Sequence, residues 1–182
     1  MGEILDKCCN IVSACVNKNI RIALDSLSNR IGISKIVNDI KMFRYKSHYW
    51  QVVKREMADA ISDCIIKYKE SCIGNRRIEG IYIADLTGGE HSYNQGYGGK
   101  DLDIIIHVEG CYDKVAKRQF ESNVEYCIEN TISIILNEYF GCDPKKLLDI
   151  PNLIEIHVVS GKDDIPYYNM IKARSRSLIR LM

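Results

Sequence analysis

Apolar side chains recur at intervals of three and four residues in several stretches of the chain, which is the spacing of one face of an α-helix. Glycine and asparagine residues stand where two of these stretches stop, as is common at helix ends. The pattern predicts helices over 3–18, over 20–40 as one or two pieces broken near Gly32, over 49–71 with an end at Gly74 and Asn75, and over 112–140.

Three short runs rich in isoleucine and valine lie after the third of these helices, and such residues favour β-strands. The runs cover 78–86, 102–108 and 153–159. The glycine-rich connection over 87–100 has room for a short helix. The order strand, helix, strand, helix, strand behind a helical region then predicts an α/β (α+β) fold, with a mixed or antiparallel sheet and helices packed on one face. The expected units are an N-terminal helical extension over 1–45, a core over 46–165 and a basic C-terminal tail over 166–182.

The composition is that of a globular protein of ordinary size. The chain has 182 residues, 46% of them hydrophobic, and a formal net charge of +1, so a globally basic nucleic-acid binder is not expected. No apolar run approaches the roughly 20 residues that cross a bilayer, so no membrane partner is expected. Acidic residues near the start, Glu3 and Asp6, stand where an export signal would carry basic ones, which predicts a cytoplasmic protein.

Eight cysteines are spread along the chain without a C-x-x-C pair. No histidine stands at zinc-finger spacing from them, so a structural zinc site is not indicated. Several fall on apolar helical stripes, which favours buried, reduced thiols that pack as small hydrophobic groups. Disulfides would instead need an oxidising compartment or a hyperthermophilic source.

The run Asp101-Leu102-Asp103 opens the second predicted strand and is the most informative stretch. Side chains alternate across a strand, so Asp101 and Asp103 share one face and Leu102 points to the core. Two adjacent carboxylates repel each other and resist desolvation, and a divalent cation relieves both costs. Oxygen ligands suit Mg²⁺ or Mn²⁺.

The third predicted strand carries a further acid, Glu155, between core-facing isoleucines. If this strand neighbours the second, Glu155 approaches Asp101 and Asp103, and three carboxylates on one sheet face form a two-metal site. Upstream, Gly88 and Gly89 follow the first strand, and their backbone amides can approach a phosphate closely.

A glycine pair, the gap over 90–100, the Asp-Leu-Asp run and a later acid together resemble the DNA polymerase beta-like nucleotidyltransferase superfamily, in its minimal form. The similarity runs from about residue 49 to residue 160. It implies that Asp101, Asp103 and Glu155 are catalytic and hold Mg²⁺ or Mn²⁺. It further implies that Gly88 and Gly89 contact the β and γ phosphates of a nucleotide.

The resemblance also implies the reaction and the partners. An NMP, with AMP expected first, would move from an NTP such as ATP to a hydroxyl of a protein, an RNA or a small molecule. Some members of the family work with a separate helical protein, so a helical partner is a possibility for this chain, as is a homo-oligomer. The chain departs from the family in having Glu90 and His91 where many members have an arginine, and Lys100 is the cation expected to bind nucleotide instead. The alternative is a catalytically weak or inactive module that binds nucleotide or RNA on the same fold.

Three further features have two interpretations each. His107 and His157 stand an even number of residues from the acids of their strands, so they are expected on the same face. Each is either a metal ligand or a hydrogen-bonded structural histidine. The segment 41–55 mixes five cations with four aromatic residues, which suits single-stranded nucleic acid or a helix start with buried aromatics. The 167–182 tail either attracts RNA or an acidic partner, or forms a helix that packs on the sheet.

Overall fold

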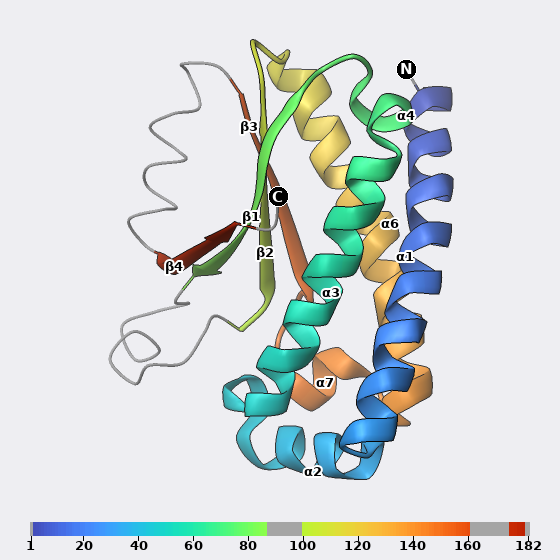
Figure 1. Cartoon of the computed structure of the whole chain (residues 1–182), viewed down its shortest axis with the longest axis vertical. Coiled ribbons are helices and arrows are strands. Elements are labelled where there is room, and N and C mark those ends of the chain that lie inside the picture. The colour runs from blue at the N-terminus through green and yellow to red at the C-terminus, as the bar shows by residue number, and fades with distance from the viewer. Residues whose placement is uncertain (1, 87–99, 161–174, 181–182) are drawn as a thin grey trace.

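A layer of helices covers one face of a four-stranded sheet in this computed structural model, which describes residues 2–86, 100–160 and 175–180 (Figure 1). The mixed fold with N-terminal helices confirms the predicted fold class. Its elements are α1 (Gly2–Arg30), α2 (Ile33–Phe43), the 3₁₀-helix η1 (Arg44–Lys46), α3 (His48–Lys67), α4 (Lys69–Ile73), β1 (Ile78–Leu86), β2 (Leu102–Val108), α6 (Lys114–Phe140), α7 (Pro144–Leu148), β3 (Ile154–Ser160) and β4 (Ser175–Arg180).

The sheet is mixed, with the strand order β3-β2-β1-β4. Strand β1 runs antiparallel to both β2 and β4, whereas β2 and β3 run parallel. The parallel pair is joined by α6, which crosses the helix-covered face, as a parallel connection requires. The predicted first and last residues of β1 and of β2 are confirmed, and β3 begins and ends one residue later than predicted.

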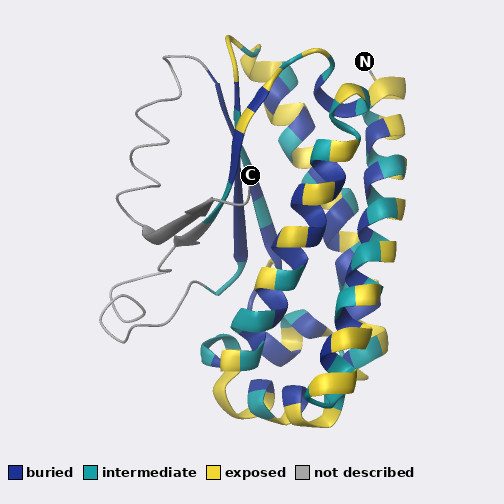
Figure 2. Ribbon diagram, viewed as in Figure 1, coloured by how far each residue is buried: buried dark blue, intermediate teal, exposed yellow. Residues whose placement is uncertain are grey.

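The two faces of the sheet differ in chemistry because side chains alternate along each strand. Ile104 and Ile106 of β2 and Ile156 and Val158 of β3 belong to the core that the helices complete. Asp103 follows the opposite parity and therefore lies on the other face. Figure 2 shows the buried residues of α1, α3 and α6 turned toward one another and toward the sheet.

Helix α1 is one continuous helix of 29 residues rather than separate pieces. It packs against α6 and α3, and it ends just before Gly32, whose φ of 94° is unfavourable for other residues, so the predicted break is confirmed. Its buried stripe consists of Cys8, Val12, Val16, Ile20, Leu24 and Leu27.

The two other long helices begin at side-chain caps. The Ser47 hydroxyl accepts a hydrogen bond from the Trp50 amide (3.1 Å) at the start of α3, and the Asp113 carboxylate accepts one from the Ala116 amide (2.9 Å) at the start of α6. The helix predicted over 49–71 is divided at Tyr68 into α3 and α4, and Gly74 follows α4 as expected. None of the helices among the described residues combines the length and the apolar character needed to cross a membrane.

The end of the described chain forms a strand. Residues 175–180 make β4, which pairs with the outer edge of β1, so the helical interpretation of the tail is wrong for this segment. The pairing supplies partners to backbone groups of β1 that a helix would have left exposed at the sheet edge.

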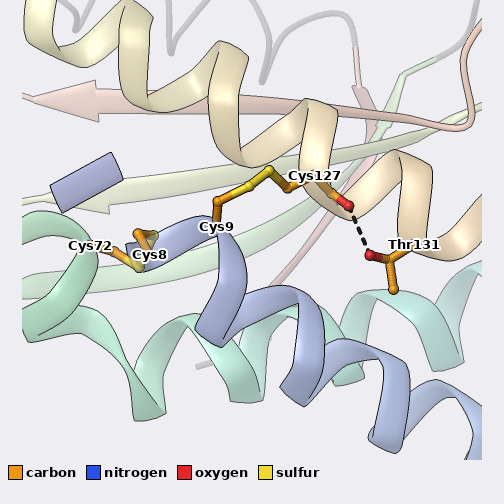
Figure 3. Close-up of a disulfide and its surroundings, with 5 residues drawn as sticks. All are labelled: Cys8, Cys9, Cys72, Cys127 and Thr131. Atoms are coloured by element: carbon orange, nitrogen blue, oxygen red, sulfur yellow. Dashed lines mark hydrogen bonds between the residues drawn. A yellow bond between two sulfur atoms is a disulfide. The ribbon is translucent and has the colours of Figure 1, made fainter. Parts of the chain in front are cut away.

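Disulfides link α1 to three other helices, so the expectation of reduced thiols is wrong for six of the eight cysteines. Figure 3 shows adjacent cysteines of α1 bonded in different directions, to α4 and to α6. Nearby, the Thr131 hydroxyl donates a hydrogen bond to the Cys127 carbonyl (2.9 Å). The pairs are Cys8–Cys72, Cys9–Cys127 and Cys15–Cys64, while Cys111 and Cys142 are free.

The disulfides bridge long stretches of chain, with separations of 64, 118 and 49 residues. Closing loops of that size restricts the unfolded chain and contributes about 2–4 kcal/mol per bridge. We therefore expect reduction to lower the thermal unfolding midpoint by more than 10 °C, roughly, for a domain of this size. Circular dichroism with and without reductant measures the change.

A thiol count provides the matching control. Protein denatured without reductant should release two titratable thiols, from Cys111 and Cys142, and eight after reduction. Eight thiols before reduction, in protein purified without reductant, would contradict the pairing.

Candidate metal centre

The parallel pairing of β2 with β3 brings two acids side by side. Asp103 lies directly opposite Glu155 in the register, and Leu102 lies opposite Ile154. The two carboxylates therefore share the face of the sheet that points away from the helices. The predicted convergence of an acid of the second strand with Glu155 is confirmed for Asp103.

A histidine completes the cluster. The Nε2 atom of His157 lies 3.4 Å from Oδ1 of Asp103 and 3.5 Å from Oε2 of Glu155. One ligand atom from each of the three residues lies within 4.8 Å of the others. The Asp103 side chain is 2% exposed and that of Glu155 is 41% exposed, so the cluster opens to solvent on the Glu155 side.

The electrostatics of the cluster centre on His157. Burial alone would lower the pKa of its imidazole, but hydrogen bonds to Asp103 and Glu155 raise that pKa to about 9. In return, the His157 hydrogen bond lowers the pKa of Glu155. Burial raises the pKa of Asp103, and His157 opposes that shift. At neutral pH the imidazole is therefore charged and holds two carboxylates together.

Asp101 lies beside this cluster rather than in it. The three-residue ligand set found in the described part of the chain consists of Asp103, Glu155 and His157. Burial, followed by repulsion from Asp103 and then from Glu155, raises the pKa of Asp101 to about 6. The two acids of the predicted pair therefore repel each other, and a cation near Asp101 would relieve that repulsion.

The predicted nucleotide-binding residues have different outcomes. Gly88 and Gly89 lie outside the described residues. The ammonium of Lys100 lies 5.0 Å from the centre of the Tyr45 ring, an arrangement typical of a cation–π contact. A role for Lys100 in binding nucleotide stays a prediction.

Lys54 was not among the predicted site residues, yet the structure places its ammonium beside the acids, as a second cation after His157. Lys54 is only 8% exposed, and its Nζ donates a hydrogen bond to the backbone carbonyl of Asp101 (3.2 Å). Its charge also lowers the pKa of Asp101 and of Asp103, against the larger effect of burial. The sequence carried no sign of this role, because Lys54 stood among several basic residues of one segment.

Most of the basic and aromatic segment 41–55 has structural contacts. The indole of Trp50 is fully buried, and its Nε1 donates to the Lys100 carbonyl (2.9 Å). Arg44 donates to the Leu147 carbonyl (2.7 Å), and Arg55 pairs with Asp59 (3.5 Å). These contacts favour the interpretation as a helix start with buried aromatics over a platform for single-stranded nucleic acid.

Helix α6 holds the outer edge of β3. The carboxylate of Glu125 accepts a hydrogen bond from the Ile156 amide (2.9 Å), and that of Glu121 accepts one from the Val158 amide (2.8 Å). These amides lie on either side of His157, so α6 fixes the strand that carries two of the three ligands. The contacts also protect an edge that would otherwise be open to another strand.

His107, the other histidine with the parity of the acids, does not join the cluster. Its Nε2 lies 3.4 Å from a carboxylate oxygen of Glu79. This carboxylate–imidazole pair lies on the same sheet and outside the ligand set found in the described part of the chain, so it serves as a control for experiments on the cluster.

Two carboxylates and one imidazole suit a divalent metal ion, and the nitrogen ligand differs from the oxygen-only set predicted from the strands. Imidazole shifts preference from Mg²⁺ toward transition ions, of which Mn²⁺ also accepts carboxylates readily. No protein-family model, curated protein or solved structure matches this chain. The chemistry of the site is therefore inferred from its own geometry.

The raised pKa of His157 predicts a stability that depends on pH. The folded value of about 9 exceeds the ordinary value of 6.5, so the stabilisation is fully present below pH 6.5 and is lost as the pH rises through 9. The shift corresponds to a loss of about 3 kcal/mol at most. Denaturant unfolding in the presence of a chelator, repeated across this range, measures it.

The His157→Gln variant should lack this decline, since glutamine does not titrate. The matched control is His107→Gln, which removes the histidine of the Glu79 pair and should keep the wild-type slope. A His157→Gln variant whose stability falls with pH as steeply as that of wild type would rule out the charged imidazole.

Proposed function

We propose that this protein is a metal-dependent nucleotidyltransferase that moves an NMP, with AMP as first candidate, from an NTP to a hydroxyl of a protein, RNA or small-molecule acceptor. The observation that carries the proposal is the register of Asp103 against Glu155, and both of these acids raise the pKa of Asp101. This is the convergence that the resemblance of the sequence to the polymerase beta-like family requires. The mixed sheet with helices on one face supports it as well.

Asp101, Asp103 and Glu155 would hold the metal, with His157 as a fourth donor. Bound divalent cations would neutralise these acids and the charge of the triphosphate. The acceptor oxygen would form a bond to the α-phosphorus while the bond from that phosphorus to the bridging oxygen breaks, and pyrophosphate would leave. Glu155 is the most exposed member of the cluster and is therefore the base proposed to take the hydroxyl proton.

One observation favours the second candidate, a module that binds nucleotide without turnover. The His157 imidazolium already balances part of the negative charge of the cluster, so the fold does not need a metal to keep Asp103 and Glu155 together. The departure at Glu90 and His91 points the same way. Transfer of a labelled nucleotide separates the two candidates, because the module binds and does not transfer.

The disulfides within the fold bear on the compartment that we propose for the protein. Three disulfides are characteristic of an oxidising compartment or of the cell interior of a hyperthermophile. We propose that the predicted cytoplasmic location holds only in the second case.

We expect wild-type protein to bind Mn²⁺, and to bind ATP more tightly when Mn²⁺ is present. Electron paramagnetic resonance of free Mn²⁺ and calorimetry with ATP measure the two affinities. The double variant Asp101→Asn/Asp103→Asn should lose at least about tenfold in Mn²⁺ affinity, because it removes two anionic ligands. Incubation with ATP labelled at the α-phosphate should then label an acceptor in wild type only.

Glu79→Gln is the control for this experiment. It removes a carboxylate paired with a histidine on the same sheet and should keep the wild-type affinity for Mn²⁺. Equal Mn²⁺ affinity in wild type and the double variant would refute the metal site. Binding without any labelled product would select the binding module.

A further inference from the structure

Trp50 and Lys54 lie one helical turn apart on α3 and point the same way, toward the start of β2. Side chains four residues apart share one face of a helix. Both are buried, with exposures of 0% and 8%. A tryptophan N–H and a lysine ammonium buried on one face need acceptors, and both find them at the start of β2.

The acceptors are two consecutive backbone carbonyls. Trp50 Nε1 donates to the carbonyl of Lys100 (2.9 Å), and Lys54 Nζ donates to the carbonyl of Asp101 (3.2 Å). The next residue is held from the side of β3, because the Leu102 amide donates to the Leu153 carbonyl (2.9 Å). Three residues in succession are thus fixed through their backbones directly before Asp103.

This arrangement matters because Asp101 precedes the strand. Strand β2 begins at Leu102, so the β-ladder does not hold the Asp101 backbone. Asp101 is also repelled by Asp103 and Glu155, which favours movement of its side chain away from them. Hydrogen bonds from α3 oppose that movement through the backbone.

We propose that Trp50 and Lys54 are positioning residues that hold Asp101 and Asp103 in the geometry that binds metal. The inference rests on the proposed function, since it concerns the same metal site. Neither residue needs to touch the metal, because each acts through the carbonyl that it binds. Helix α3 thus does for the start of β2 what Glu121 and Glu125 of α6 do for β3.

A positioning role and a simple charge effect predict opposite results for Lys54. Removing a positive charge near a cation site strengthens cation binding if only Coulomb forces act. Removing a hydrogen bond that holds the ligands weakens binding instead. Trp50 offers a test without any change of charge, because Trp50→Phe deletes the N–H donor and keeps an aromatic ring.

The experiment measures Mn²⁺ affinity by electron paramagnetic resonance for wild type, Trp50→Phe and Lys54→Met, with circular dichroism to show that each is folded. One net hydrogen bond corresponds to a loss of about threefold to tenfold, which we expect for Trp50→Phe. Lys54→Met should also bind Mn²⁺ more weakly than wild type. Where transfer is observed, both variants should raise the metal concentration needed for half-maximal rate, and saturating Mn²⁺ should restore the rate.

Two matched controls come from the same helix. Tyr49→Phe removes a polar group from the neighbouring aromatic residue, and Arg55→Met removes the adjacent positive charge, which pairs with Asp59. Both variants should keep Mn²⁺ affinity within about twofold of wild type. The hydrogen bonds from α3 to the start of β2 come from Trp50 and Lys54, and neither variant changes them. Restoration by excess metal would distinguish positioning from a general loss of structure.

The outcomes separate this inference from the proposed function. Wild-type affinity in Trp50→Phe, or tighter binding in Lys54→Met, would overturn the positioning role and leave the metal site standing. Absence of Mn²⁺ binding in wild type would overturn both. If Lys54→Met does not fold, Trp50→Phe alone decides the matter.

Discussion

The constraint on which the site depends is the placement of like charges on neighbouring parallel strands. A buried carboxylate is costly unless a partner compensates it, and the register leaves Asp103 opposite Glu155 with Asp101 nearby. The fold meets this cost with cations from two directions. His157 bridges Asp103 and Glu155 from within β3, and Lys54 approaches the start of β2 from α3. An apolar residue at the position of Asp103 would have been simpler to bury, and a perturbed carboxylate of this kind is the basis on which we propose a bound cation.

The helical layer holds the two strands that carry the acids, β2 and β3, in position. α1 is bonded through disulfides to α3, α4 and α6, and two of these helices reach the strands that carry the acids. From α3, Trp50 and Lys54 hold backbone carbonyls, and from α6, Glu121 and Glu125 hold backbone amides. The crosslinks therefore restrain helices whose polar side chains set the position of the strands.

Strand periodicity was sufficient to predict the parts of the site that depend on one strand at a time. It put Asp103 and Glu155 on the polar faces of their strands, because alternation follows from local backbone geometry, whereas the shared face of Asp101 and Asp103 stays a prediction because Asp101 precedes β2. Whether β2 and β3 lie side by side could not be predicted in this way, because the alternation of side chains along a strand does not decide which strand is its neighbour. The disulfide partners could not be predicted from the sequence either, since Cys9 and Cys127 meet only through the packing of α1 on α6. The burial of Lys54 and the pairing of β4 with β1 likewise depend on tertiary contacts.

Under the proposed function, the histidine gives the site two alternative ways to satisfy its acids. With a proton on its ring, His157 is a cation that binds Asp103 and Glu155. To bind a metal through Nε2, the same ring must give up that proton, so metal and proton compete for one atom. Asp101 is not held by His157 in the described contacts and remains repelled by its neighbours in the protonated state. A metal ion that contacts Asp101 as well as Asp103 would therefore relieve a repulsion that the imidazolium leaves in place, and this difference is the physical reason to expect that a metal displaces the proton.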